Sequence, residues 1–97
     1  MLTHIVCWKY KAETSAAERA DHVARLRRLP EVIPNILSFS VGSDILHLER
    51  SFDTGLVAVY PDRAALDFYT VHPHHQEVAA LGKTIAEKVV SVDFLTD

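Results

Sequence analysis

Apolar side chains alternate with other side chains along residues 2–11. Leu2, Val6 and Trp8 fall on one side of an extended chain at these positions, and His4 shares that side with them. A period of two is typical of a β-strand, because successive side chains of a strand point to opposite faces of its sheet. The sequence therefore predicts a first strand here, with His4 on the same face as Trp8.

A helical spacing of apolar residues comes next. Ser15 and Glu18 match a capping box, in which each side chain bonds the backbone of the other residue. Apolar residues then return every three or four positions, at Ala20, Val23, Leu26 and Leu29. We expect an amphipathic helix that Pro30 ends, because proline has no backbone N–H to continue it. Its exposed side is predicted to carry Glu18 and, four residues later, His22.

Two further strands are predicted around the middle of the chain. Residues 36–41 alternate between apolar and polar side chains, and this strand is expected to extend a little past Gly42. A polar stretch over residues 43–51 leads to a second run of β-forming residues, 52–60. Gly55 lies inside that run, where glycine is typical of a bulge or a close backbone approach. A long hairpin is the simplest connection between the two strands.

Two prolines frame the helices of the second half. Pro61 and Asp62 offer a turn and an N-cap for a helix over residues 63–71. Pro73 ends that helix, because a proline pushes the residue before it, His72, out of the helical region of backbone space. The chain is therefore expected to turn a corner at His72 and to begin another short helix at Pro73.

The end of the chain is predicted to return to the sheet. His75 and Val78 lie on one face of the short helix after the corner. Gly82 is expected to interrupt this helix, because glycine is a poor helix former, with one further turn over residues 83–87. Residues 88–95 are rich in valine and predict a fourth strand.

The predicted order of elements is β-α-β-β-α-β, with residues 1–97 in a single domain. This order fits the ferredoxin-like arrangement, an α+β fold in which four antiparallel strands carry the helices on one face. The other face would then lie in water, although Val90, Val92 and Phe94 of the fourth strand would add apolar side chains to it. We therefore expect a homodimer in which two open sheet faces pack together about a two-fold axis.

The charge balance and the hydropathy disfavour two classes of partner. Ten Lys and Arg against 13 Asp and Glu leave a formal charge of −3, and the interspersed charges show no basic footprint for nucleic acid. No segment approaches the roughly 18 apolar residues of a membrane span, and no signal-peptide pattern opens the chain. We expect a cytoplasmic protein whose single cysteine, Cys7, is a buried structural thiol.

One segment concentrates side chains that handle protons. Tyr69-Thr-Val-His72-Pro-His-His75 places one phenol and three imidazoles within seven residues. Histidine exchanges protons near neutral pH, whereas a tyrosine with an ordinary pKa stays protonated there. Proton abstraction next to a carbonyl needs a base and a neutral donor for the enolate oxygen. His75 is the candidate base and Tyr69 is the candidate donor.

The same segment has two other interpretations. In the first, His72 caps the short helix, His74 lies in solvent, and Tyr69 is a packing residue. In the second, His4, His72 and His75 bind a metal ion. The metal site is disfavoured, because the proline disturbs the helical spacing and no cysteine or acidic residue stands nearby at a recognisable spacing. We therefore expect neither a metal nor another cofactor.

Two residues of the strands also have an expected place. Trp8 either stacks a flat ligand in an apolar pocket or packs in the core or at a dimer interface. Asp93, near the end of the chain, is expected to end its strand or to face outward from it.

Three stretches of the chain carry a resemblance to a known family. They are residues 3–11, residues 36–42 with 52–59, and the segment from Tyr69 to His75 leading to Val92-Asp-Phe94. In this order and spacing they resemble the stress-responsive α/β-barrel (Dabb) domain over essentially the full chain. The resemblance implies a ferredoxin-like subunit that pairs into a dimeric α/β barrel.

The resemblance also implies a set of site residues. The family includes heat-stable plant stress proteins and a plant polyketide cyclase that performs an aldol condensation without cofactor or metal. The catalytic tyrosine and histidine of that cyclase match Tyr69 and His75, and one of its pocket histidines matches His4. Thr54 stands where the cyclase has another pocket histidine, which implies a different substrate. His72 recurs across the family, which implies a structural role.

The sequence therefore predicts a homodimer whose subunit binds a small organic molecule in an apolar cavity. His75 and Tyr69 are the expected catalytic pair of a cyclase or isomerase. The expected ligand contacts are His4, Trp8, Thr54 and His72. Two alternatives stay open: a non-enzymatic stress-response or structural dimer, and a cofactor-independent monooxygenase that uses the same cavity differently.

Overall fold

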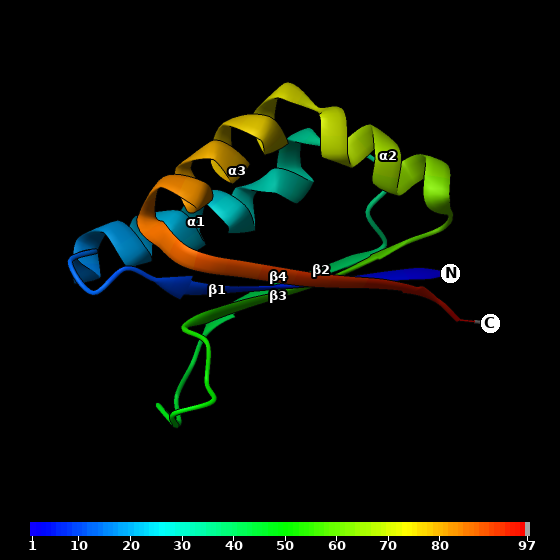
Figure 1. Ribbon diagram of the computed structural model, residues 1–97. Coiled ribbons are helices and arrows are strands. Elements are labelled where there is room, and N and C mark those ends of the chain that lie inside the picture. The colour runs from blue at the N-terminus through cyan, green and yellow to red at the C-terminus, as the bar shows by residue number, and fades with distance from the viewer. Residues whose placement is uncertain (97) are drawn as a thin grey trace.

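The four strands form one antiparallel sheet in the order β2-β3-β1-β4. The computed structural model describes residues 1–96, whose elements are β1 (Leu2–Tyr10), α1 (Ala16–Val32), β2 (Ser38–Ser43), β3 (Thr54–Tyr60), α2 (Arg63–Val71), α3 (Pro73–Ile85) and β4 (Ala86–Leu95). All three helices cover one face of the sheet, and the other face is uncovered (Figure 1). The predicted ferredoxin-like fold is confirmed, as is the corner that separates α2 from α3.

The alternation along β1 builds the covered face of the sheet. Leu2, Val6, Trp8 and Tyr10 are all buried on the side of the helices, where removal of their apolar surface from water stabilises the fold. Because β1 lies between β3 and β4, these side chains form the centre of the core. Apolar side chains of the other elements complete it: Leu26, Leu29, Leu56, Tyr60, Val78 and Ile85.

α1 begins as predicted and ends later than predicted. The Ser15 side chain accepts a hydrogen bond from the Glu18 backbone, and the Glu18 carboxylate accepts one from the Ser15 backbone, which confirms the capping box. The prediction that Pro30 ends the helix is wrong, because α1 continues to Val32. Pro30 lies in the last turn, where few helical hydrogen bonds remain to be lost. No helix among residues 1–96, α1 included, has the length and apolar character to cross a membrane.

Gly82 does not interrupt α3, which runs without a break from Pro73 to Ile85. A Cβ atom at position 82 would lie 3.0 Å from Nε1 of Trp8 and 3.1 Å from Nε2 of His22. Glycine is therefore needed because the helix packs closely against two rings, and not because the helix ends there. The turn predicted over residues 83–87 is divided between the end of α3 and the start of β4.

The strands of the hairpin begin two residues later than predicted, at Ser38 and Thr54. Gly55 marks neither a bulge nor a close approach, because it pairs in register with both neighbouring strands and no atom lies within 4 Å of its Cβ position. The irregular point of the sheet lies between Lys9 and Tyr10, where the pairing of β1 with β4 shifts its register.

The uncovered face of the sheet carries an apolar patch. Val57 of β3, Ile5 of β1 and Val92 of β4 stand in one row across the sheet. Val57 is 43% exposed, Val92 is 53% exposed, and Phe94 is 42% exposed. The loop between β2 and β3 projects on this same side, away from the helices (Figure 1). A contiguous apolar face of this kind is typical of a protein interface.

Substitution of Gly82 by alanine tests the close approach of α3 to the core. We expect the free energy of unfolding to fall by about 1 kcal/mol, because the strain at Trp8 and His22 outweighs the better helix propensity of alanine. Urea denaturation followed by tryptophan fluorescence measures the change. Ala80→Gly, at an exposed position of the same helix, isolates the propensity term. If Gly82→Ala raised the free energy of unfolding by as much as Ala80→Gly lowers it, the packing argument would be contradicted.

Candidate functional site

A cavity of about 210 Å³ lies between the helices and the covered face of the sheet. Its wall is mostly apolar, with side chains from strands and helices: Val6, Leu26, Leu56, Ala79 and Val89. His4 and Trp8 of β1, Tyr69 of α2 and His75 of α3 line the same cavity. Four of the residues that the sequence singles out therefore line one cavity, although they come from three elements. An apolar cavity with a few convergent polar groups is typical of a small-molecule site.

The corner between α2 and α3 brings Tyr69 and His75 together. Their ring centroids are 4.3 Å apart, with an angle of 39° between the ring planes. His72 has an extended backbone and serves as the C-cap of α2 and the N-cap of α3, as the following Pro73 requires. In one continuous helix, residues six positions apart would point about 120° away from each other. The helix break is therefore what turns both rings toward one cavity.

The hydrogen bond of His75 decides which of its ring nitrogens can act as a base. Nδ1 lies 3.0 Å from the Thr70 carbonyl oxygen, and because a carbonyl only accepts, Nδ1 carries the hydrogen. The lone pair of the neutral ring is then on Nε2. Burial lowers the pKa of His75 more than the Thr70 bond raises it, and the nearby His4 and His72 lower it further. His75 is therefore neutral at pH 7, the form that accepts a proton.

Tyr69 is placed as a hydrogen-bond donor. Its side chain is 2% exposed, and burial raises the pKa of its hydroxyl well above the ordinary value of 10.0, so the hydroxyl keeps its proton. The Tyr60 ring lies beside it, with 5.5 Å between the centroids. Burial, followed by the proximity of Tyr69, also raises the pKa of Tyr60. The proximity of the two hydroxyls lowers the pKa of Tyr69 against the larger effect of burial, although the Tyr60 hydroxyl makes no hydrogen bond of normal distance and angle within residues 1–96.

His4 reaches the cavity from β1 with a carboxylate behind it. The register of β1 and β4 places Asp93 opposite His4, and Oδ1 of Asp93 contacts Nδ1 of His4. The prediction that Asp93 faces outward or ends its strand is wrong, because the alternation of β4 turns it to the same side as His4. Since Asp93 occupies Nδ1, Nε2 is the nitrogen left for a ligand. The centroids of His4 and Tyr69 are 6.2 Å apart.

The structure does not bring Thr54 or His72 to this cavity. Thr54 pairs with Trp8 in the sheet, at the opposite end of β1 from His4, and its hydroxyl is bonded to that of Tyr10 at 2.8 Å. Nδ1 of His72 accepts a hydrogen bond from the backbone of the second residue after it, at 3.2 Å. His72 therefore caps α3, the structural role that the alternative interpretation gives it.

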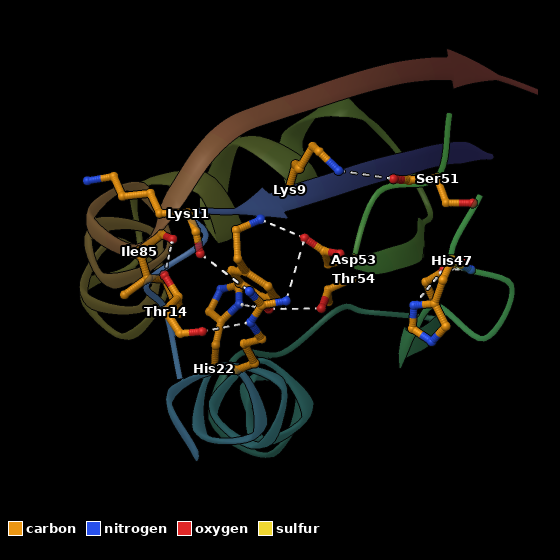
Figure 2. A network of polar contacts seen from close by, with 12 residues as sticks. Lys9, Lys11, Thr14, His22, His47, Ser51, Asp53, Thr54 and Ile85 are labelled. Atoms are coloured by element: carbon orange, nitrogen blue, oxygen red, sulfur yellow. Dashed lines mark hydrogen bonds and ion pairs between the residues drawn. The ribbon is translucent and has the colours of Figure 1, made fainter. Parts of the chain in front are cut away.

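A second polar cluster surrounds the Tyr10 hydroxyl and includes His22 and Thr54, which are labelled in Figure 2. His22 of α1 is fully buried, so the prediction that it lies with Glu18 on the exposed side is wrong. Its Nδ1 is 2.7 Å from the Tyr10 hydroxyl, which bonds Thr54 as well. Burial lowers the pKa of His22 and keeps the ring neutral. Tyr10 supplies a hydrogen-bond partner for Nδ1 of this buried ring, whereas Nε2 has none within residues 1–96.

Further contacts hold the chain around this cluster. The Tyr10 backbone N–H donates to a carboxylate oxygen of Asp53 at 2.8 Å, and the Arg19 guanidinium lies 5.2 Å from the centroid of the Tyr10 ring. The Thr14 hydroxyl donates to the Ile85 carbonyl at 2.8 Å (Figure 2). These contacts join the end of β1 to α1 and to the residue before β3, and they join the loop before α1 to the end of α3. They give the cluster a structural role.

Sequence reasoning missed three polar residues that line the cavity: Thr70, Lys83 and Ser91. Lys83 follows His75 by eight positions, a spacing that keeps both on one face of an unbroken helix. Because the sequence predicted that the helix is interrupted at Gly82, it did not predict that His75 and Lys83 share a helix face. Ser91 lies two residues before Asp93, on the same face of β4. The pairing of β1 with β4 sets Ser91 opposite Val6 and Asp93 opposite His4, which shows that both face the helices. Within residues 1–96, no three histidine, cysteine or carboxylate side chains converge as a metal site requires.

The fold agrees with a comparison to known protein families. The stress-responsive A/B barrel domain matches residues 2–96. The chain belongs to this family. The resemblance to the Dabb domain that was inferred from the sequence is thereby confirmed over residues 2–96. No curated protein matches the chain.

Several solved structures have the same fold as this Dabb domain. A dimeric ferredoxin-like protein of unknown function from Thermobifida fusca has a TM-score of 0.89 at 21% identity, over 98% of this chain and 90% of that one. A similar dimeric protein from Jannaschia sp. CCS1 has a TM-score of 0.82 at 25% identity, over 98% of both chains. A hydroxynitrile lyase from Passiflora edulis has a TM-score of 0.88 at 19% identity, over 99% of this chain and 93% of that one.

Two matched substitutions test which buried hydroxyls stabilise the protein. Tyr10→Phe is expected to lower the free energy of unfolding by about 2 kcal/mol, because it leaves His22 and Thr54 without a partner. Tyr60→Phe removes a hydroxyl that is unpartnered within residues 1–96, so stability should stay unchanged or rise by about 1 kcal/mol. Urea denaturation at pH 7 measures both. Equal losses in the two variants would show that the cluster's hydrogen bonds do not stabilise the fold.

Proposed function

We propose that the cavity binds a small, mostly apolar carbonyl compound and that the protein catalyses a cofactor-free proton transfer on it. The reaction leads to an aldol-type cyclisation or to an isomerisation. The observation that supports this proposal is the pairing of Tyr69 and His75 at one cavity, with rings 4.3 Å apart. One of them has a free lone pair, and the other has a hydroxyl that stays protonated.

His75 begins the reaction as the base. Its Nε2 takes a proton from the carbon next to the carbonyl, and the C–H electron pair forms the C=C bond of an enolate. The negative charge develops on the carbonyl oxygen, where the Tyr69 hydroxyl donates a hydrogen bond. The enolate carbon then attacks a second carbonyl of the same molecule, or it is protonated at another position. All protons and electrons balance without a redox partner, so the proposed reaction needs no cofactor.

His4 supplies a second proton carrier at the same end of the cavity. The carboxylate of Asp93 contacts its Nδ1 and orients the ring, as carboxylate–histidine pairs do in other sites. In an aldol step, the alkoxide formed from the attacked carbonyl takes its proton from such a group. A hydroxynitrile lyase with the same fold supports the view that this scaffold can serve an enzyme.

Deuterium exchange detects the first step without knowledge of the product. In D₂O the wild-type protein is expected to accelerate exchange of the α-protons of small aryl ketones, observed by NMR. His75→Gln should slow the catalysed exchange about 10²–10⁴-fold, because it removes the base. Tyr69→Phe should slow it about 10²-fold, because it removes the donor to the enolate oxygen.

His74→Gln provides the matched control, because His74 is exposed on the same helix. This variant should keep the wild-type exchange rate. Exchange that is no faster with the wild-type protein than with His75→Gln contradicts the catalytic proposal. Binding of the ketones without any exchange would instead favour the non-enzymatic alternative.

The pH profile of the exchange identifies the base. His75 acts only in its neutral form, and its pKa lies below the ordinary value of 6.5. The fall in rate at acid pH, as the ring takes up a proton, should therefore be centred below pH 6.5. A fall centred above pH 6.5 would identify another group as the base.

We also propose that two subunits pair through the uncovered face of the sheet. Its row of Val57, Ile5 and Val92 is apolar and partly exposed in one subunit. The similar proteins from Thermobifida fusca and Jannaschia are dimeric. A two-fold contact between two such faces removes the apolar patch of each subunit from water.

Two matched substitutions test the dimer. Val92→Asp should give monomers or unfolded chains, because the dimer would bury an unpaired charge. Val71→Asp, on an exposed position at the end of α2, should leave the dimer intact. Sedimentation velocity measures the mass of each at micromolar concentration. A dimeric Val92→Asp protein would show that another surface forms the contact, and a monomeric wild-type protein would rule out the dimer.

A further inference from the structure

The cavity has two chemically different ends. The rings of His4 and His75 lie beside that of Tyr69 at one end, whereas Trp8 lies against Gly82, the neighbour of Lys83, at the other. The spacing of residues on α3 and on β1 gives a similar distance between the two ends of the cavity. His75 and Lys83 are eight residues apart on α3, which is about 12 Å along a helix axis. His4 and Trp8 are four residues apart on β1, which is about 13 Å along a strand.

Apolar wall separates these two ends. Val6 lies midway between His4 and Trp8 on β1, and Ala79 lies midway between His75 and Lys83 on α3, with both side chains at the cavity. Over a length of about 12 Å, a volume of about 210 Å³ leaves room for one extended chain or one flat ring. The shape therefore favours a narrow, elongated ligand with an apolar middle.

Lys83 is the one residue of the cavity wall with a permanent charge. No aspartate or glutamate of the described chain lines the cavity. Within residues 1–96, Lys83 takes part in no ion pair. Asp93, which contacts His4, stands at the opposite end. The positive charge of Lys83 at the wall of an apolar cavity attracts an anionic group and repels a cationic one.

We propose that the ligand is an extended oxo acid, with its reacting carbonyl at the His75 end and a carboxylate at the Lys83 end. This inference rests on the proposed function and adds the substrate class to it. The two groups of the ligand lie roughly 8–12 Å apart, because the lysine side chain reaches part of the distance along the helix. Lys83 acts as a specificity-determining residue and takes no part in the proton transfer.

A pair of compounds that differ only in charge tests the inference. 8-Oxononanoate carries a methyl ketone and a distant carboxylate, and 8-oxononanamide replaces the carboxylate with a neutral amide. Titration calorimetry should show that the wild-type protein binds the carboxylate about fivefold more tightly, as expected for one partly exposed ion pair. Lys83→Gln should bind both compounds equally. Lys11→Gln, at an exposed lysine away from the cavity wall, should keep the preference.

A shorter oxo acid tests the span. 4-Oxopentanoate has the same two groups too close together to reach both ends of the cavity. The wild-type protein should therefore bind it no more tightly than its amide. A carboxylate preference of the same size for the short acid would overturn the two-ended arrangement.

Exchange of the ketone α-protons separates failure of this inference from failure of the proposed function. Equal wild-type affinity for 8-oxononanoate and its amide, with exchange that depends on His75, would overturn the role of Lys83 and leave the proposed function intact. Absence of both binding and exchange for the two long compounds would overturn the proposed function, and the substrate class with it.

Discussion

β1 hydrogen-bonds to β3 on one side and to β4 on the other, and the side chains of the site take their positions from these two ladders. Their register sets His4 opposite Asp93, and Trp8 opposite Thr54. Because the side chains of a strand have a period of two, a shift of one residue would turn His4 and Trp8 to the uncovered face. The cavity, the carboxylate behind His4 and the polar cluster at Tyr10 therefore depend on the register of one central strand.

Features with a local cause could be predicted from the sequence. The alternation of β1 places His4 and Trp8 on one face, and burial of that face confirms it. The N-cap at Asp62 and the proline at position 73 predict the bounds of α2, which the structure reproduces as Arg63–Val71. The corner at His72 follows from the clash between a proline ring and the residue before it. Each of these signals is contained within a few neighbouring residues.

Features that depend on contacts between distant segments could not be predicted in this way. Gly82 has the sequence signature of a helix break, but the Trp8 and His22 rings that require it lie on β1 and α1. His22 has the spacing of an exposed residue, and it is buried because Tyr10 offers a hydrogen bond. Asp93 faces His4 because of a pairing between the two ends of the chain. Without the register, local propensity gives no information on these partners.

The edge strand β4 is almost fully exposed in one subunit. After Ala86, every side chain of β4 is exposed in one subunit, and Val89 and Ser91, on the face toward the helices, line the cavity. Water therefore reaches the cavity along this edge while the helices stay in place. Intermediates that hydrolyse would be lost in such a site, whereas a base that trades protons with solvent is reset between turnovers.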